Sequence, residues 1–154
     1  MSRLLTLVVL LAAPAAVAQP SDRRVERALA KNEILYTVED NGDYRMLYET
    51  ENGRSQLVWI RPETYSAGDV EVREIFSYAN DLPEGMALPA DWAERLLVYN
   101  ADYVVGAWSR LGDRIVFSAR VAADAPDDVL ISVMELVLNT ADLVEEEMTG
   151  ADNW

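Results

Sequence analysis

Carboxylates, hydroxyls and guanidinium groups are the main side chains of this chain that could carry out a reaction. The sequence contains no histidine and no cysteine. This excludes a Ser-His-Asp triad, a thiol nucleophile, and zinc sites built from imidazole or thiolate ligands. The 27 acidic residues leave glycoside hydrolysis open, which needs two carboxyl groups about 5–10 Å apart, one with a raised pKa.

Glu74 is the acidic residue most suited to such a role, because it interrupts an otherwise apolar strand face. A carboxyl group buried there would have a raised pKa. The structural alternative is that this face is partly exposed, or that Arg73 or another arginine pairs with Glu74, and structural ion pairs outnumber catalytic ones. We therefore expect no catalytic residue.

Two acidic segments could bind a cation. Residues 40–43 (DNGD) begin like a calcium loop, but Tyr44, Met46 and Leu47 then occupy positions that need oxygen ligands, so a hairpin turn is favoured. Residues 145–147 (EEE) indicate a solvated charge run. We therefore expect no metal ion and no cofactor.

Aromatic and apolar side chains are the candidates for an interaction surface. Tyr44, Met46 and Tyr48 share one face of a predicted strand, and Leu130, Met134 and Val137 belong to an apolar helix stripe. Exposed patches of this kind mark binding sites. The alternative for both groups is packing in the core, where strand aromatics and helix stripes usually lie.

The pattern of apolar residues predicts an α+β fold with two or three helices and an antiparallel sheet of about five or six strands. Helices are predicted at 22–30, 91–101 and from Pro126 to Gly150, and a capping box (Asp91, Glu94) is predicted for the second. The predicted strands form a meander and a later hairpin, and cover residues 33–39, 44–50, 56–61, 70–78, 103–110 and 114–121.

Residues 1–18 have the features of an export signal. Arg3 gives the positive start, residues 4–13 are apolar, and Ala16-Val17-Ala18 is typical of a cleavage site. The apolar stretch is shorter than the roughly 20 residues of a spanning helix. We expect cleavage at about Ala18, a single domain over 19–154 without stable membrane insertion, and a periplasmic or secreted location.

The charge of −14 arises from 13 basic and 27 acidic residues. Such a charge opposes binding to nucleic acid. It would favour a basic protein partner, although solubility alone is a sufficient reason for an acidic surface.

Details of the second half resemble the YbjN-like family of small bacterial domains, which have the fold of type III secretion chaperones. The resemblance rests on residues 96–100 (LLVYN), the strands at 104–110 and 115–121, and the segments APDD (125–128) and TADLVE (140–145), within a match over about 24–150. It implies a two-layer α/β sandwich with no established enzymatic role. Secretion chaperones act in the cytosol, so their task does not transfer to an exported chain.

The sequence therefore predicts a non-enzymatic exported domain that binds protein or peptide, with chaperone-like holding of a client as one form of that activity. Association of copies into a homo-oligomer, through a helix or a sheet edge, is a further option. Two alternatives stay open: a carboxylate-based hydrolase acting on envelope glycan, and an acidic cation-binding protein.

Overall fold

In the part of the chain that the structure describes, a six-stranded antiparallel sheet and three helices form two layers, which confirms the predicted α+β class. The computed structural model describes residues 21–50 and 53–154. The predicted export signal lies outside these residues. The strand order is β1-β2-β3-β4-β6-β5, so a four-stranded meander is followed by the predicted hairpin. In chain order the elements are α1 (Arg23–Lys31), β1 (Thr37–Val38), β2 (Tyr44–Glu49), β3 (Ser55–Ala67), β4 (Val70–Asp81), α2 (Ala90–Asp102), β5 (Ala107–Leu111), β6 (Arg114–Ala122) and α3 (Asp127–Thr149).

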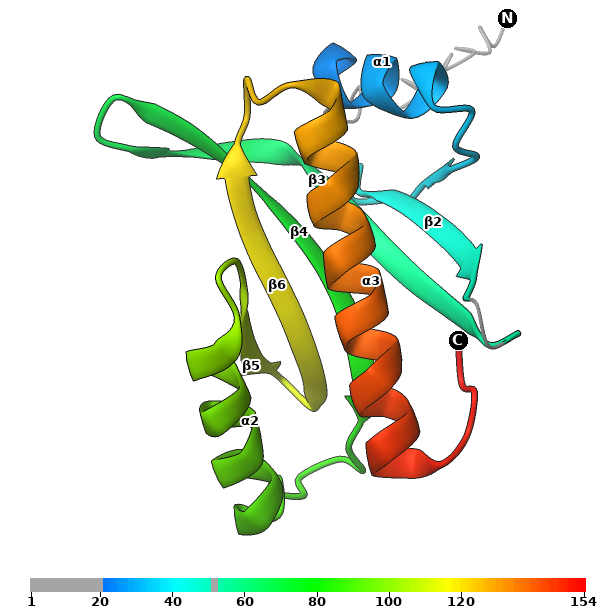
Figure 1. Cartoon of the computed structure of the whole chain (residues 1–154), viewed down its shortest axis with the longest axis vertical. Coiled ribbons are helices and arrows are strands. Elements are labelled where there is room, and N and C mark those ends of the chain that lie inside the picture. The colour runs from blue at the N-terminus through cyan, green and yellow to red at the C-terminus, as the bar shows by residue number, and fades with distance from the viewer. Residues whose placement is uncertain (1–20, 51–52) are drawn as a thin grey trace, which may run out of the picture.

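The long helix α3 lies across one face of the sheet, over β3, β4 and β6 (Figure 1). Its buried stripe includes Met134, Val137 and Ala141, at the predicted spacing of three and four residues. Gly150 ends the helix in the left-handed conformation (φ 65°), as its position predicted. The first and second helices, α1 and α2, pack on the same side, because Leu29 and Leu96 belong to the core that α3 forms with the sheet.

Alternation along the strands separates two faces of the sheet. On β4, Ile75 and Ala79 face the helices and are fully buried. Phe76 and Tyr78 face the other way and form a second, smaller cluster with Val116. In the part of the chain that is described, no helix contributes to this second cluster. We call this side the open face.

Three local predictions are wrong. The strand predicted at 33–39 is reduced to two residues, because Glu33 turns the chain with a φ of 56° after the end of α1. The third strand continues through Pro62, where the register with β4 shifts and a strand can tolerate a missing N–H donor. The helix α2 starts after Pro89, and no side chain caps it, so the capping box at Asp91 does not form.

Within the described residues, no helix is both long enough and apolar enough to cross a lipid bilayer.

Candidate functional site

The predicted interaction residues lie in the core rather than on the surface. Side chains with almost no exposed area are Tyr44, Met46, Leu130, Met134 and Val137. The physical reason is that the even-numbered positions of β2 and the apolar stripe of α3 face each other across the layer interface. The prediction that these five residues form an interaction surface is therefore wrong: they pack in the core and stabilise the fold.

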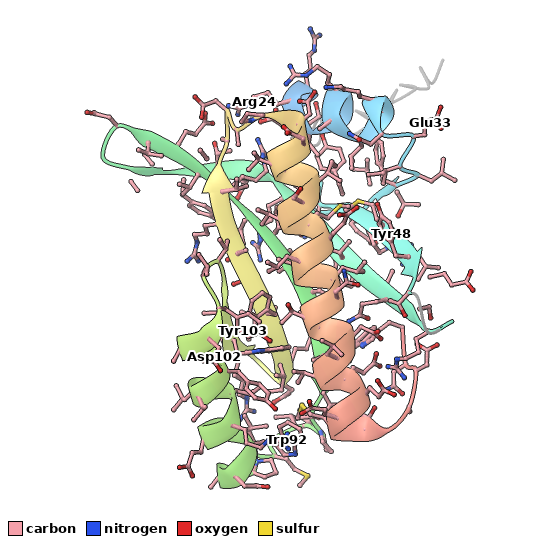
Figure 2. All side chains as sticks on the ribbon, viewed as in Figure 1. Arg24, Glu33, Tyr48, Trp92, Asp102 and Tyr103 are labelled. Atoms are coloured by element: carbon pink, nitrogen blue, oxygen red, sulfur yellow. The ribbon has the colours of Figure 1, made fainter. Side chains whose placement is uncertain are left out.

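Tyr48 is the partly exposed member of that predicted group. It lies between β2 and α3, as its labelled side chain in Figure 2 shows, and lines a cleft of about 560 Å³ with Glu135 and Leu138. Burial, and then the negative charge of Glu135, raise the pKa of its hydroxyl. Because the cleft also contains Glu49 and Asp142, it is acidic around a neutral phenol.

Glu74 lies on the open face and is held by two arginines. Its carboxylate forms an ion pair with Arg61 at 2.9 Å and another with Arg120 at 3.0 Å. Arg73, the partner suggested by its neighbouring position, points into the opposite layer. The pairing favours the structural interpretation of Glu74, since two cations already engage both of its oxygens.

The acidic segments predicted to be a turn and a charge run have structural roles. At residues 40–43 the chain makes the predicted hairpin turn, with the Gly42 N–H donating to the Glu39 carbonyl oxygen at 2.8 Å. Within residues 145–147, Glu146 and Glu147 are exposed as predicted, but the prediction of a solvated run is wrong for Glu145, which is fully buried and whose carboxylate accepts a hydrogen bond from Arg54 at 3.0 Å. Among the residues that the structure describes, no three acidic side chains are grouped closely enough to hold a metal ion.

An aromatic cluster occupies the centre of the open face. Trp59 of β3 stacks on Phe76 of β4 with ring centroids 5.5 Å apart and planes within 6°. Tyr78 meets both rings edge-on, at 5.0 Å from Trp59 and 5.5 Å from Phe76. Trp154 packs beside Tyr78 at 6.1 Å. We call Trp59, Phe76, Tyr78 and Val116 the aromatic cluster.

Two arginines cover this cluster from the solvent side. The guanidinium of Arg61 lies 5.0 Å from the Phe76 ring centre, and that of Arg114 lies 4.6 Å from the Tyr78 ring centre. Both are within the range of cation–π attraction. Phe76 and Tyr78 are themselves only 4% and 8% exposed. Beside its leucines, the open face therefore presents the covering guanidinium groups and the partly exposed Trp59.

Three shallow depressions follow one another over the open face. The first, about 390 Å³, is lined mainly by Leu35, Leu47 and Leu57. The second, about 360 Å³, lies between the 39–43 turn and the aromatic cluster. The third, about 220 Å³, is bounded by Arg61, Arg110 and Arg120 with Glu74. Together with the aromatic cluster they form the candidate functional site.

One buried acid lines the second depression. Burial raises the pKa of the Asp43 carboxyl, although the Asn41 amide donates to it at 2.8 Å and acts in the opposite direction. Glu39 and Asp40 line the same depression beside Trp59 and Tyr78. The site thus combines aromatic rings, guanidinium groups and one carboxyl group that is easier to protonate than usual.

The sequence-based candidates for an interaction surface did not include Trp59, Phe76 or Tyr78, nor Arg61 or Arg114. The available signal was alternation: Trp59 and Arg61 are two residues apart on one strand, and Glu74, Phe76 and Tyr78 follow the same period on the next. What the alternation leaves open is which of the two faces the helices cover.

The chain was also compared with known proteins. No family model matches it, and no curated protein matches it.

Proposed function

We propose that the chain is a non-enzymatic exported domain that binds a protein or peptide through its open face. The observation that carries this proposal is the composition of that face: Trp59, Phe76 and Tyr78, with Arg61 and Arg114 stacked on them. Tryptophan, tyrosine and arginine are the residues most enriched at the energetic centres of protein interfaces.

The absence of a covering helix supports the same proposal. All three helices contribute to the core on the other face, and the described residues place only strands, the 39–43 turn and Trp154 around the aromatic cluster. Phe76 and Tyr78 are buried beneath the two arginines, so a partner would meet the guanidinium groups, the partly exposed Trp59 and the exposed Leu47. The shallow shape suits an extended segment better than a small molecule, which usually requires a deeper cavity.

Membership of the YbjN-like family and chaperone-like holding of a client remain part of the proposal. They are supported by the element order helix, meander, helix, hairpin and long helix, which the fold contains. If the chain is exported, as proposed, its client is expected to be an exported protein as well.

Site-specific photocrosslinking tests the binding surface. A photoreactive amino acid placed at Leu47 or Ser118, both on the open face, should crosslink to a partner in cells. The same amino acid at Asn139, an exposed position of α3, is the matched control and should not. Equal yields at all three positions, or crosslinks only at Asn139, would contradict the proposal.

Export is tested separately. The mass of the protein recovered from the periplasm or medium of an expressing bacterium should correspond to a chain that begins at Gln19. Recovery of the full-length chain from the cytosol alone would contradict the proposed address.

Hydrolysis of envelope glycan is a second candidate, favoured by one observation. Asp43, with its raised pKa, lines the same depression as Glu39 and the sugar-sized aromatic surface of Trp59. A raised pKa is what a carboxyl group requires to act as a general acid. Release of soluble sugar from purified cell wall, abolished by Asp43→Asn, would replace the first proposal by this one; no release by the unmodified protein would dismiss it.

A further inference from the structure

The three depressions of the open face adjoin one another. Arg45 lines both the first and the second, and Phe76 lines both the second and the third. They therefore make one path, which starts at the β1 and β2 edge and ends between β4, β6 and β5. We call this path the open-face track.

The track crosses the strands instead of following them. Adjacent strands are about 4.8 Å apart, so a path over six strands is roughly 24 Å long. An extended chain advances about 3.4 Å per residue. The track therefore has room for a segment of about seven residues.

The two ends of the track differ in chemistry. The end at β2 is lined by leucines, of which Leu35 is 89% and Leu47 64% exposed. At the other end Arg61, Arg110 and Arg120 line the depression with one carboxylate, Glu74, and Arg110 also pairs with Asp113 at 2.9 Å, so these three arginines and two carboxylates leave a charge of +1. Five of the 13 basic residues of the chain line the three depressions, namely Arg45, Arg61, Arg110, Arg114 and Arg120.

The middle of the track limits where a negative charge could lie. Glu39, Asp40 and Asp43 line it, opposed by Arg45 and Arg114. A carboxylate there would meet three acidic side chains and two arginines, whereas at the Arg120 end it would meet three arginines and two carboxylates, Glu74 and Asp113. Charge complementarity is therefore confined to one end.

We propose that the open-face track binds an extended acidic peptide segment, with an apolar side chain at the Leu47 end and carboxylates at the Arg120 end. This rests on the proposed function, because it names the partner of the same surface. It also reverses the expectation from net charge, which favours a basic partner. The reason is that recognition depends on the groups within a few ångströms, and more distant charges are largely screened at physiological ionic strength.

A peptide array of defined composition tests the proposal. It contains heptapeptides with leucine at one end, tyrosine in the middle and two Glu, two Gln or two Lys at the other end, in both chain directions. The full chain should bind the best Glu peptide at least tenfold more tightly than its Lys counterpart. A preference for Lys would overturn the acidic-segment proposal and leave peptide binding intact, whereas binding to no member would contradict both.

Two substitutions with opposite expected effects on affinity test whether the Arg120 end of the track binds the carboxylates. Arg120→Gln removes a side chain that is 65% exposed, and should weaken binding of the Glu peptide about three- to tenfold. Glu74→Gln removes the opposing carboxylate and should strengthen binding by a similar factor.

Arg95→Gln is the matched control, because Arg95 is also a largely exposed arginine paired with one glutamate, Glu147, but on the helical side. It should leave binding unchanged. Equal weakening by Arg120→Gln and Arg95→Gln would assign the effect to net charge and overturn the proposal. If an acidic polysaccharide competes for the track and free Glu peptide does not, the track would be assigned to glycan binding. That outcome would also overturn the proposal.

Discussion

The buried guanidinium of Arg73 donates a 2.5 Å hydrogen bond to the carboxylate of Asp22, the residue that caps α1. Arg73 lies on β4 with 1% of its area exposed, and its other terminal nitrogen donates to the carbonyl oxygens of Arg61 and Pro62, where β3 loses its regular register. One side chain thus compensates the irregular strand and fixes the start of the first helix to the sheet.

Replacing Asp22 by Ala should destabilise the protein by about 3–5 kcal/mol, because it leaves the Arg73 charge buried without its carboxylate partner. The loss of the helix cap, typically about 1 kcal/mol, is part of the same change. Urea unfolding measures the effect. Glu71→Gln removes another partner of this cluster, an exposed one bound to Arg24, and should hardly move the midpoint; a similar loss in both variants would contradict the role given to burial.

The same cluster predicts loss of stability in acid. The Arg24 guanidinium, followed by the Arg24 backbone N–H and the Arg73 guanidinium, hold the pKa of Asp22 far below its usual range, although burial opposes them. The side chains of Arg24 and then Thr64 lower the pKa of Glu71 to about 2. Both groups bind protons more readily in the unfolded chain. The contribution of Asp22, and a much smaller one from Glu71 because solvent screens its exposed ion pair, is therefore complete above about pH 4.5 and is lost as the pH falls toward 2.

Urea midpoints measured from pH 7 to pH 2 check this dependence, and Asp22→Asn should flatten its acid limb. Burial raises the pKa of Glu145, so its effect on the pH dependence of stability is opposite to that of Asp22 and Glu71. Its contribution is complete below its unfolded pKa of about 4.3 and decreases as the pH rises through its folded pKa. A midpoint that stays constant below pH 4.5 would show that the Asp22 cluster is not formed in solution.

Gly106 and Gly112 provide a matched pair at the two ends of β5. A Cβ at Gly106 would lie 2.7 Å from Phe117 Cζ and 2.9 Å from the Ser118 carbonyl oxygen, whereas one at Gly112 meets nothing within 4 Å. Both residues have positive φ. Gly112→Ala should therefore cost only the backbone term of about 1–2 kcal/mol, and Gly106→Ala should cost at least about 2 kcal/mol more from overpacking. Equal thermal midpoints for the two variants would contradict the packing at Phe117.

Asn100 protects the edge strand β5. Its amide oxygen accepts from the Trp108 N–H at 2.6 Å, and its amide nitrogen donates to the Trp108 carbonyl oxygen at 3.3 Å. The side chain thus takes the place of a neighbouring strand at this position. Asn100→Ala should cost about 1–3 kcal/mol and promote association through the freed edge.

Hydrogen exchange at the Trp108 amide and light scattering measure these two effects. Asn100→Asp keeps the acceptor and loses the donor, so it should retain protection of the Trp108 N–H better than Asn100→Ala does. Unchanged exchange in the alanine variant would mean that the edge does not depend on Asn100.

Strong local patterns were sufficient to predict much of the fold. The three- and four-residue spacing in α3, its termination at Gly150, and the turn at Gly42 are properties of short segments, and all three are confirmed. The short β1 and the passage of β3 through Pro62 depend instead on how α1 packs and on the side chain of Arg73. Those are interactions between distant residues, which no local pattern contains.

The open face was missed for a related reason. The alternating residues Phe76 and Tyr78 are larger and more apolar than Ser77 and Ala79, so the sequence favours the aromatic side of β4 as the one facing the helices. The structure places α3 over the smaller residues, because small side chains allow a helix to lie close to the strand. The aromatic side is left for the candidate site.

The order of the chain has a consequence for how this protein is made. Every strand of the sheet emerges from the ribosome before α3, yet α3 supplies the apolar layer that β3, β4 and β6 require. The nascent sheet therefore lacks this apolar layer until α3 has left the ribosome, and we expect stable folding only then. Such late folding would suit the proposed export, because a translocation channel takes chains that have not yet folded.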